Sequence, residues 1–289
     1  MHPAPSIILF TVLSGFGFGA LFFLGLGLNP AIGWDAFFLY ALSAGCGAVG
    51  LAFSFFHLGH PERALKAFTQ WRSSWLSREG WLATITLTLA AVHGGMIVFL
   101  GTANEVLGQV LSGFALLTIF ATSMIYAQLK TVPRWNDIST PIIFLASAMV
   151  GGAFLVPGPY VIPALVVFAA LQALIWWRGD SRFSARKHTI GTATGLGNHG
   201  TVSAFEPPHT GTNYLMNEMI HVVGRRNTMQ IRVIGVIFAI VLPVLVLVFG
   251  SDQLFRYAAL GLHLFGLLFI RWLFFAQAEH VVGLYYGKR

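Results

Sequence analysis

The sequence predicts an all-α, polytopic membrane protein: a bundle of eight transmembrane helices with a long cytoplasmic loop between the sixth and seventh helices. Of its 289 residues, 56% are hydrophobic and only 9% are charged, whereas soluble domains carry about a quarter charged residues. Long uncharged apolar runs occupy most of the length. The connections between these runs differ sharply in their content of Lys and Arg. These observations exclude a disordered chain, a disulfide scaffold and a DNA-binding basic domain.

Eight apolar runs approach the length of about 20 residues that one membrane-spanning helix needs. The fifth and sixth runs are short, and Pro157-Gly158-Pro159 between them predicts a helical hairpin with a tight turn. Residues 178–230 are rich in Gly, Thr, Ser and His, which predicts a polar cytoplasmic insertion within a single transmembrane domain of residues 1–289. The expected spans are residues 6–28, 35–57, 81–101, 107–128, 141–157, 160–177, 233–250 and 254–276.

The distribution of basic residues predicts the orientation of the bundle. Fifteen of the 17 Lys and Arg residues lie in the connections after the second, fourth and sixth spans or at the C-terminus. The positive-inside rule therefore places both termini and these connections in the cytoplasm, in a bacterial inner membrane. Arg256 alone lies on the opposite side. Arg271 lies about one turn inside the last span, where we expect it to extend to the interface as an anchor. The net charge of +7 thus reports orientation rather than nucleic-acid binding.

The most informative polar residues lie where the second span ends and the third begins. His57 ends the second span and Glu79 opens the third, so both are expected at one membrane depth. Reduction of a quinone needs hydrogen-bond donors for the ring oxygens and a titratable group that exchanges protons. Arg63 could stabilise a developing quinol anion, and Tyr126 is a further candidate contact. The alternative is interfacial anchoring, because His, Arg and aromatic residues are common at the headgroup level.

Two deeper histidines and one cysteine raise the question of metal cofactors. His93 and His263 on different spans are candidate axial ligands of haem b, with hydrogen-bonded core histidines as the favoured alternative. No other metal-ligand spacing is present in the sequence. Cys46, the single cysteine, cannot hold an iron–sulfur cluster alone, since such clusters usually need four thiolates. Any such cluster is therefore expected in a partner chain.

Two stretches of the sequence carry a family resemblance. The element from His57 to Ala64, with Ser77 and Glu79 downstream, resembles the first signature of the membrane anchor subunit of dimethyl sulfoxide reductase. Thr131-Val132-Pro133 with Trp135, followed by Thr140-Pro141, is similar to the second signature of that family. Thr140 before Pro141 is also expected to cap the fifth span. The resemblance spans most of the chain and implies the eight-helix layout.

The resemblance implies a non-catalytic anchor within a quinone-linked oxidoreductase. The partners would be an iron–sulfur subunit and a molybdenum catalytic subunit, which would hold all the clusters and the molybdenum cofactor. The quinone, ubiquinone or menaquinone, would bind at His57 and Glu79, with Arg63, Ser77 and Tyr126 around it. The loops after the second and fourth spans are expected to contact the partner through Lys66, Trp71, Arg72, Arg78, Arg134 and Trp135.

The predicted orientation separates the members of this family. In dimethyl sulfoxide reductase the catalytic subunits face the periplasm, whereas the charge distribution here places the corresponding loops inside. The chain is therefore most similar to the anchor of membrane-bound, quinone-reducing sulfite dehydrogenases. The alternatives are the anchor of a dimethyl sulfoxide or polysulfide reductase, which takes electrons from quinol, and, more distantly, a transporter. A transporter would place ionisable groups and broken helices near the midplane, where this chain has only His93 and His263.

Overall fold

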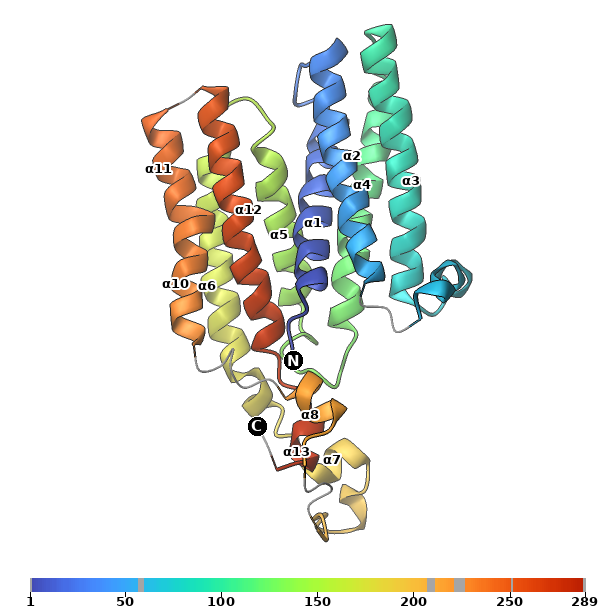
Figure 1. Cartoon of the computed structure of the whole chain (residues 1–289), viewed down its shortest axis with the longest axis vertical. Coiled ribbons are helices and arrows are strands. Elements are labelled where there is room, and N and C mark those ends of the chain that lie inside the picture. Colours follow the sequence, from blue (N-terminus) through green and yellow to red (C-terminus); the bar gives the residue numbers. More distant parts are fainter. Residues whose placement is uncertain (1, 57–59, 207–210, 221–226, 251, 288–289) are drawn as a thin grey trace.

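The structure is a computed structural model that describes residues 2–56, 60–206, 211–220, 227–250 and 252–287. Regular structure in these ranges is helical throughout (Figure 1). Seven of the described helical stretches are long and apolar enough to cross a membrane. These stretches are α1 (Pro5–Gly25), α2 (Gly33–Phe55), α3 (Trp75–Gly95) with η2 (Met96–Leu100), α4 (Glu105–Ala127), α6 (Val161–Ala185), α10 (Thr228–Val236) with η4 (Ile237–Val241) and α11 (Leu242–Phe249), and α12 (Gln253–Ala276).

The fifth predicted span, residues 141–157, corresponds to a shorter apolar helix. α5 (Ser139–Ala153) has 15 residues, which give about 22 Å of helix against a hydrocarbon core of about 30 Å. The expected cap at Thr140 is wrong, because its hydroxyl donates to the carbonyl of Trp135 at 2.8 Å, while Asp137 accepts from the amide of Ser139. α5 and α6 form the predicted hairpin, and Gly158 in the turn has a φ of 112°.

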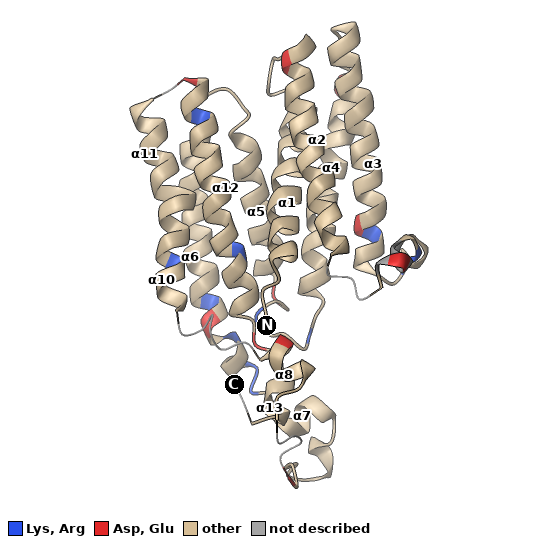
Figure 2. Ribbon diagram, in the orientation of Figure 1, with Lys and Arg blue, Asp and Glu red and all other residues tan. Residues whose placement is uncertain are grey.

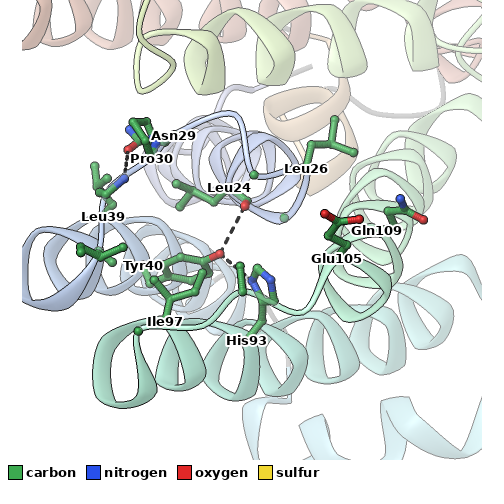
Figure 3. A pocket seen from close by; sticks show the side chains of 17 residues that line it. Leu24, Leu26, Asn29, Pro30, Leu39, Tyr40, His93, Ile97, Glu105 and Gln109 are labelled. Carbon is green, nitrogen blue, oxygen red and sulfur yellow. Dashed lines mark hydrogen bonds between the residues drawn. The ribbon is translucent and has the colours of Figure 1, made fainter.

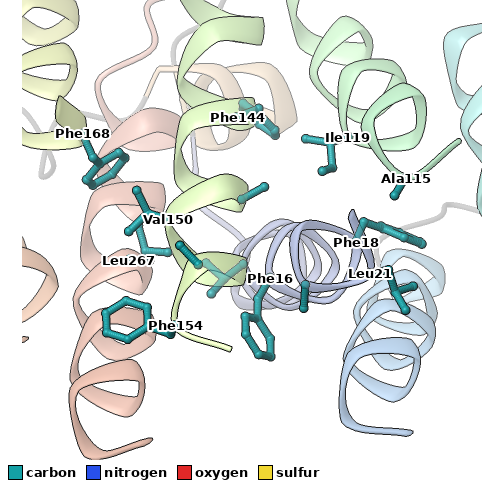
Figure 4. Packing of buried hydrophobic residues seen from close by; sticks show 14 of the residues in the cluster. Phe16, Phe18, Leu21, Ala115, Ile119, Phe144, Val150, Phe154, Phe168 and Leu267 are labelled. Atoms are coloured by element: carbon teal, nitrogen blue, oxygen red, sulfur yellow. The ribbon is translucent and has the colours of Figure 1, made fainter. Parts of the chain in front are cut away.

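The core of the bundle surrounds α1, which packs against α2, α4, α5 and α12 (Figures 1 and 4). Glycines on α1 let the neighbouring backbones approach closely, as small residues do between membrane helices. A Cβ atom on Gly19 would overlap the carbonyl of Ala148 on α5, and one on Gly17 would overlap Gly47 on α2. Phe16, Phe18 and Leu21 fill the space between these contacts.

Charged residues gather at the end of the bundle where both chain termini lie (Figure 2). Of the described Lys and Arg residues, Arg256 alone lies at the opposite end, where it donates to backbone carbonyls of residues 154, 156 and 158. The predicted insertion 178–230 begins as helix, because α6 continues to Ala185 instead of ending at residue 177. The insertion then forms α7 (Ile190–Thr194), η3 (Gly197–His199) and α8 (Tyr214–Met219), and α7 and α8 contact the C-terminal α13 (Val282–Tyr285).

The segment before α3 differs from the prediction, and the difference changes the position of Glu79 within the helix. A 3-10 segment, η1 (Pro61–Gln70), follows α2, and α3 begins at Trp75 instead of residue 81. Ser74 caps α3 by accepting from the amide of Ser77. Glu79 therefore lies in the second turn of α3, inside the helix rather than at its opening.

Candidate functional site

The Glu79 carboxyl is buried between α3 and α4 near the charged end of the bundle. Its exposed fraction is 2%, and it shares a hydrogen bond with the hydroxyl of Thr122. That hydroxyl also lies 3.0 Å from the carbonyl oxygen of Thr118. A hydroxyl has one proton and a carbonyl can only accept. When Thr122 donates to Thr118, the hydrogen bond between Thr122 and Glu79 therefore needs a proton from the carboxyl group. This pair can hold one exchangeable proton inside the bundle.

Tyr126 lies on α4 four residues after Thr122, so both occupy one face of that helix. Its ring is 4% exposed and is surrounded by aromatic rings from the loop after α4 and from α5 and α12. The ring centroids lie 5.4 Å from Trp135, 5.6 Å from Phe144 and 5.4 Å from Phe275. This cage fixes the orientation of the phenol.

Arg271 on α12 is buried, which shows that its expected extension to the interface is wrong. Its exposed fraction is 4%. One guanidinium nitrogen donates to the Ser147 hydroxyl at 2.7 Å, and the guanidinium carbon lies 3.7 Å from the centroid of the Phe144 ring. Among the described residues no carboxylate forms an ion pair with Arg271. A buried cation without a counter-charge is costly in a membrane and marks a functional position.

These three ionisable side chains belong to one neighbourhood. Tyr126 lies within electrostatic range of both Glu79 and Arg271, so the phenol is close to an acid from α3 and to a cation from α12. Such a set supplies a proton-exchanging group, a hydrogen-bond donor and a positive charge. Ser77 is also buried, and its hydroxyl has no partner within the described ranges. Of the other predicted site residues, His57 lies outside the described residues, as does the side chain of Arg63.

The residues predicted to contact a partner fall into two groups. Lys66, Trp71 and Arg72 are exposed beside the N-terminal end of α3. Arg78 on α3 holds this loop against the helix, because it donates to the carbonyls of Trp71 at 3.0 Å and Arg72 at 2.7 Å. Its guanidinium also lies over the ring of Trp75.

The second group, Arg134 and Trp135, points into the protein. Arg134 donates to Asp180 at 3.0 Å and to Gln277 at 2.9 Å. The Trp135 indole is 3% exposed and donates to the carbonyl of Phe274 at 2.9 Å. These two residues therefore join the loop after α4 to α6 and α12.

Asp137 forms ion pairs with two arginines at this end of the bundle. Its carboxylate accepts two hydrogen bonds of 3.0 Å from Arg178 and also pairs with Arg182. Burial by itself raises the pKa of the Asp137 carboxyl, but the hydrogen bonds from Arg178 and Ser139 and the charge of Arg182 outweigh it and lower that pKa to about 2. The loop after α4 is thereby fixed to the C-terminal part of α6, beyond its predicted end at residue 177.

The structure does not bring His93 and His263 together. α3 and α12, which carry them, lie on opposite sides of α1 (Figure 1). The Nδ1 atom of His93 lies 2.7 Å from the hydroxyl of Tyr40 on α2. The Nδ1 atom of His263 lies 2.7 Å from the carbonyl oxygen of Ala239 on η4. Each imidazole thus has a hydrogen-bond partner from a neighbouring helix.

Sequence reasoning did not assign three residues to the interactions at this end of the bundle. Thr122 is one of many membrane-helix threonines, and only its register against Glu79 distinguishes it. Arg271 carried a usable signal, since an arginine within an apolar run is rare. Asp137 carried one too, as an acidic residue in a loop rich in cations. The register between helices, which joins these residues, is not encoded at any single position.

Apolar helices of spanning length, a cation-rich end and buried ionisable groups define a multi-pass membrane protein. The chain belongs to the family of DMSO reductase anchor subunits (DmsC), whose model matches residues 1–162. A sulfite dehydrogenase subunit from Allochromatium vinosum is 33% identical over 330 aligned positions, which cover 99% of each chain. The anaerobic dimethyl sulfoxide reductase chain YnfH of Escherichia coli is 30% identical over 161 positions, which cover 52% of this chain and 55% of that relative. No solved structure matches the chain. The resemblance stated from the two signatures is confirmed.

Proposed function

We propose that this protein is the quinone-binding membrane anchor of a sulfite-oxidising molybdoenzyme complex. Membership of the anchor family and similarity to a sulfite dehydrogenase subunit over nearly the whole length support this proposal. Sulfite is oxidised at molybdenum in a partner subunit, and a second partner with iron–sulfur clusters carries the electrons to the membrane. The anchor passes them to ubiquinone or menaquinone, and it oxidises no sulfite itself.

The observation that carries the quinone site is the buried Glu79 carboxyl, hydrogen-bonded to Thr122 beside Tyr126. Quinone reduction consumes two protons and two electrons, so the ring needs a proton donor that can be reloaded from water. Glu79 lies near the charged end of the bundle and has the exchangeable proton. His57, Arg63 and Ser77 complete the proposed site around the ring, and Arg271 supplies positive charge to the reduced ring oxygen.

The charge distribution supports an orientation with both termini and the partner subunits on the cytoplasmic side of the bacterial inner membrane. In this arrangement α5 is the eighth membrane helix, because its hairpin with α6 returns the chain to the charged end. The polar insertion of residues 178–230 then lies in the cytoplasm as part of a single domain.

The exposed surface beside the N-terminal end of α3 is the proposed docking site of the iron–sulfur subunit. Lys66, Trp71 and Arg72 are available there, and aromatic residues and arginine are enriched at protein interfaces. Arg78 holds the loop of this surface in place, whereas Arg134 and Trp135 join the loop after α4 to α6 and α12. This chain holds no haem in the proposal, since His93 and His263 each serve a neighbouring helix.

Glu79→Gln in the intact complex tests the site. The substitution keeps the size of the side chain but removes the transferable proton, so we expect quinone-linked sulfite oxidation to fall by at least 10²-fold, at the lower end of the range for general acid catalysis. Sulfite oxidation with an artificial acceptor that takes electrons from the partner's clusters stays unchanged. Glu62→Gln in the exposed η1 segment is the matched control. Normal quinone-linked turnover in Glu79→Gln would refute the site.

A reporter fused after residue 289 tests the orientation and with it the direction of electron flow. Activity of a cytoplasmic reporter supports the sulfite-oxidising anchor. Activity of a periplasmic reporter would instead favour the alternative in which the complex reduces a sulfoxide or polysulfide with electrons from quinol, as the partial similarity to a dimethyl sulfoxide reductase chain suggests.

A further inference from the structure

A cavity lies at the opposite end of the bundle from Glu79. It has a volume of about 440 Å³ and is bounded by α1, α2, η2 and α4 (Figure 3). His93, which lines it, is 14 residues beyond Glu79 on the same helix, a distance of about 21 Å along the axis. A cavity of this volume lies within the range of small-molecule binding sites. Because of its distance from Glu79, this cavity is separate from the proposed quinone-reducing site.

The polar centre of this cavity is a hydrogen-bonded pair of buried side chains. The Tyr40 hydroxyl lies 2.7 Å from Nδ1 of His93 and 3.3 Å from the carbonyl oxygen of Leu24. Tyr40 is 8% exposed and His93 is 1% exposed, and both side chains border the cavity in Figure 3. The Tyr40 ring is fixed by Gly94, since a Cβ at that position would lie 2.8 Å from the ring. The Tyr40 hydroxyl has one proton, and the His93 imidazole also faces the backbone of Asn104. The Tyr40 hydroxyl is therefore the group that can turn to a ligand at this place.

An apolar groove adjoins the cavity, and Tyr40 lines both. The groove has a volume of about 270 Å³, lies between α2 and α3, and shares Tyr40 with the cavity. Its lining includes Phe37, Leu87 and Val98, together with Phe99, which is 80% exposed. A ligand can therefore place a polar ring at Tyr40 and His93 while its hydrocarbon tail follows the groove into the bilayer.

The backbone is irregular at the junction of the cavity and the groove. α3 passes into the π-helical segment η2, which ends at Gly101 with a φ of 64°. π-helical turns within helices occur frequently at functional sites. Here the irregular segment contributes Ile97 to the cavity, and Val98 and Phe99 to the groove.

The charge of the lining selects the kind of ligand. Glu105 is the only charged side chain among the described residues that line the cavity, and no Lys or Arg is among them. An anionic lipid headgroup would therefore meet a carboxylate without a cation to bind it. An uncharged ring with carbonyl or hydroxyl groups matches the Tyr40 hydroxyl, which can donate to a carbonyl or accept from a hydroxyl.

We propose that this cavity is a second binding site for a lipid-soluble quinone, on the membrane face opposite the partner subunits. The ring binds at the Tyr40–His93 pair and the isoprenoid tail lies in the groove between α2 and α3. The site binds its ligand from the opposite leaflet, and the proposal does not depend on the role of Glu79.

Photolabelling of the intact complex in membranes tests this site. The probe is a ubiquinone analogue with an azide on the ring and a decyl tail, and peptide mapping locates the label. We expect label within residues 96–109, suppressed by excess decylubiquinone but not by decane. Ala103→Trp fills the exposed mouth of the cavity and abolishes this label, whereas Thr102→Trp, beside it but outside the lining, does not. Tyr40→Phe removes one hydrogen bond and weakens the labelling roughly threefold to tenfold.

Absence of label in residues 96–109, or equal label there in Ala103→Trp, would overturn the proposal. Label confined to residues 57–79 and 122–126 has the same consequence, while it leaves the proposed quinone-reducing site standing. Label confined to residues 96–109 supports the second site and counts against the site at Glu79. The two proposals therefore fail separately in one experiment.

Discussion

The imidazole of His263 donates a hydrogen bond to the carbonyl oxygen of Ala239, with 2.7 Å between Nδ1 and the oxygen. This carbonyl lies four residues before Pro243, which has no N–H to donate to it. A carbonyl can only accept, so Nδ1 of His263 carries the proton. The histidine thus replaces the backbone donor that proline removes from the π-helical segment η4. This pairing gives the buried histidine a structural role at η4.

The first prediction concerns this relationship. His263→Phe leaves the buried Ala239 carbonyl without a partner, and we expect a loss of about 1–3 kcal/mol in the free energy of unfolding. Pro243→Ala restores a backbone donor, so the cost of His263→Phe falls in that background. Unfolding of the four proteins of this double-mutant cycle in detergent measures the coupling. Equal costs of His263→Phe in the two backgrounds would contradict the pairing.

The second prediction concerns the contact between α1 and α5. Gly19→Ala places a methyl group on the backbone of Ala148, so we expect a destabilisation of about 1–3 kcal/mol from overpacking. Gly15→Ala on the same helix meets open space and leaves the stability unchanged or slightly raised. The readouts are the midpoint of thermal unfolding and the yield of folded protein. The interpretation fails if the two variants behave alike.

The third prediction concerns the pH dependence of stability. The ion pairs hold the pKa of Asp137 at about 2, below its ordinary value near 4. The stabilisation is therefore complete above pH 5 and is lost as the pH falls through 4 towards 2. At pH 6 we expect Asp137→Asn to unfold more easily by about 2 kcal/mol.

The difference between wild type and Asp137→Asn should narrow steadily between pH 5 and pH 2. Asp35→Asn, an exposed change at the opposite end of the bundle, serves as the control. A difference that stays constant down to pH 2 would show that the ion pairs of Asp137 do not stabilise the fold.

The fourth prediction concerns the buried charge near the proposed quinone-reducing site. Arg271→Gln removes the positive charge close to the reduced ring, and we expect quinone-linked turnover to fall on the order of 10²-fold. Arg271→Lys keeps the charge but loses the planar contact with Phe144, so its turnover lies between those of the wild type and Arg271→Gln. Lys130→Gln removes an exposed cation at the same end and is the matched control. Lower turnover in all three variants to the same degree would point to a general effect of charge at this surface.

The spans could be predicted from the sequence because their length is dictated by the bilayer. The apolar runs located the seven described helices of spanning length to within about five residues. The exceptions are the start of α3 and the end of α6, where charged residues are part of the helix. The third span was expected near residues 81–101 with Glu79 at its opening, but Ser74 caps the helix and α3 begins at Trp75. α6 likewise runs eight residues past its predicted end, since Asp137 holds Arg178 and Arg182.

The sequence indicated two of the residues that meet at the candidate site, but not the two that join them. An acidic residue at the membrane boundary indicated Glu79 as a titratable group, and an aromatic residue at the end of α4 indicated Tyr126. Thr122 and Arg271 join them only through the packing of α3 against α4 and of α12 against α5. A single sequence carries no signal for the rotation of one helix against another, so the contacts that bring Thr122 and Arg271 to this place could not be predicted.

The central place of α1 has a consequence for biosynthesis. α1 leaves the ribosome first, yet α12, which packs against it, is made almost 250 residues later. Until then the face of α1 that packs against α12 remains exposed to lipid or to the insertion machinery. Truncation before α12 should therefore leave the early helices inserted but open to degradation, and quality control would act on the last helix as the signal of completion.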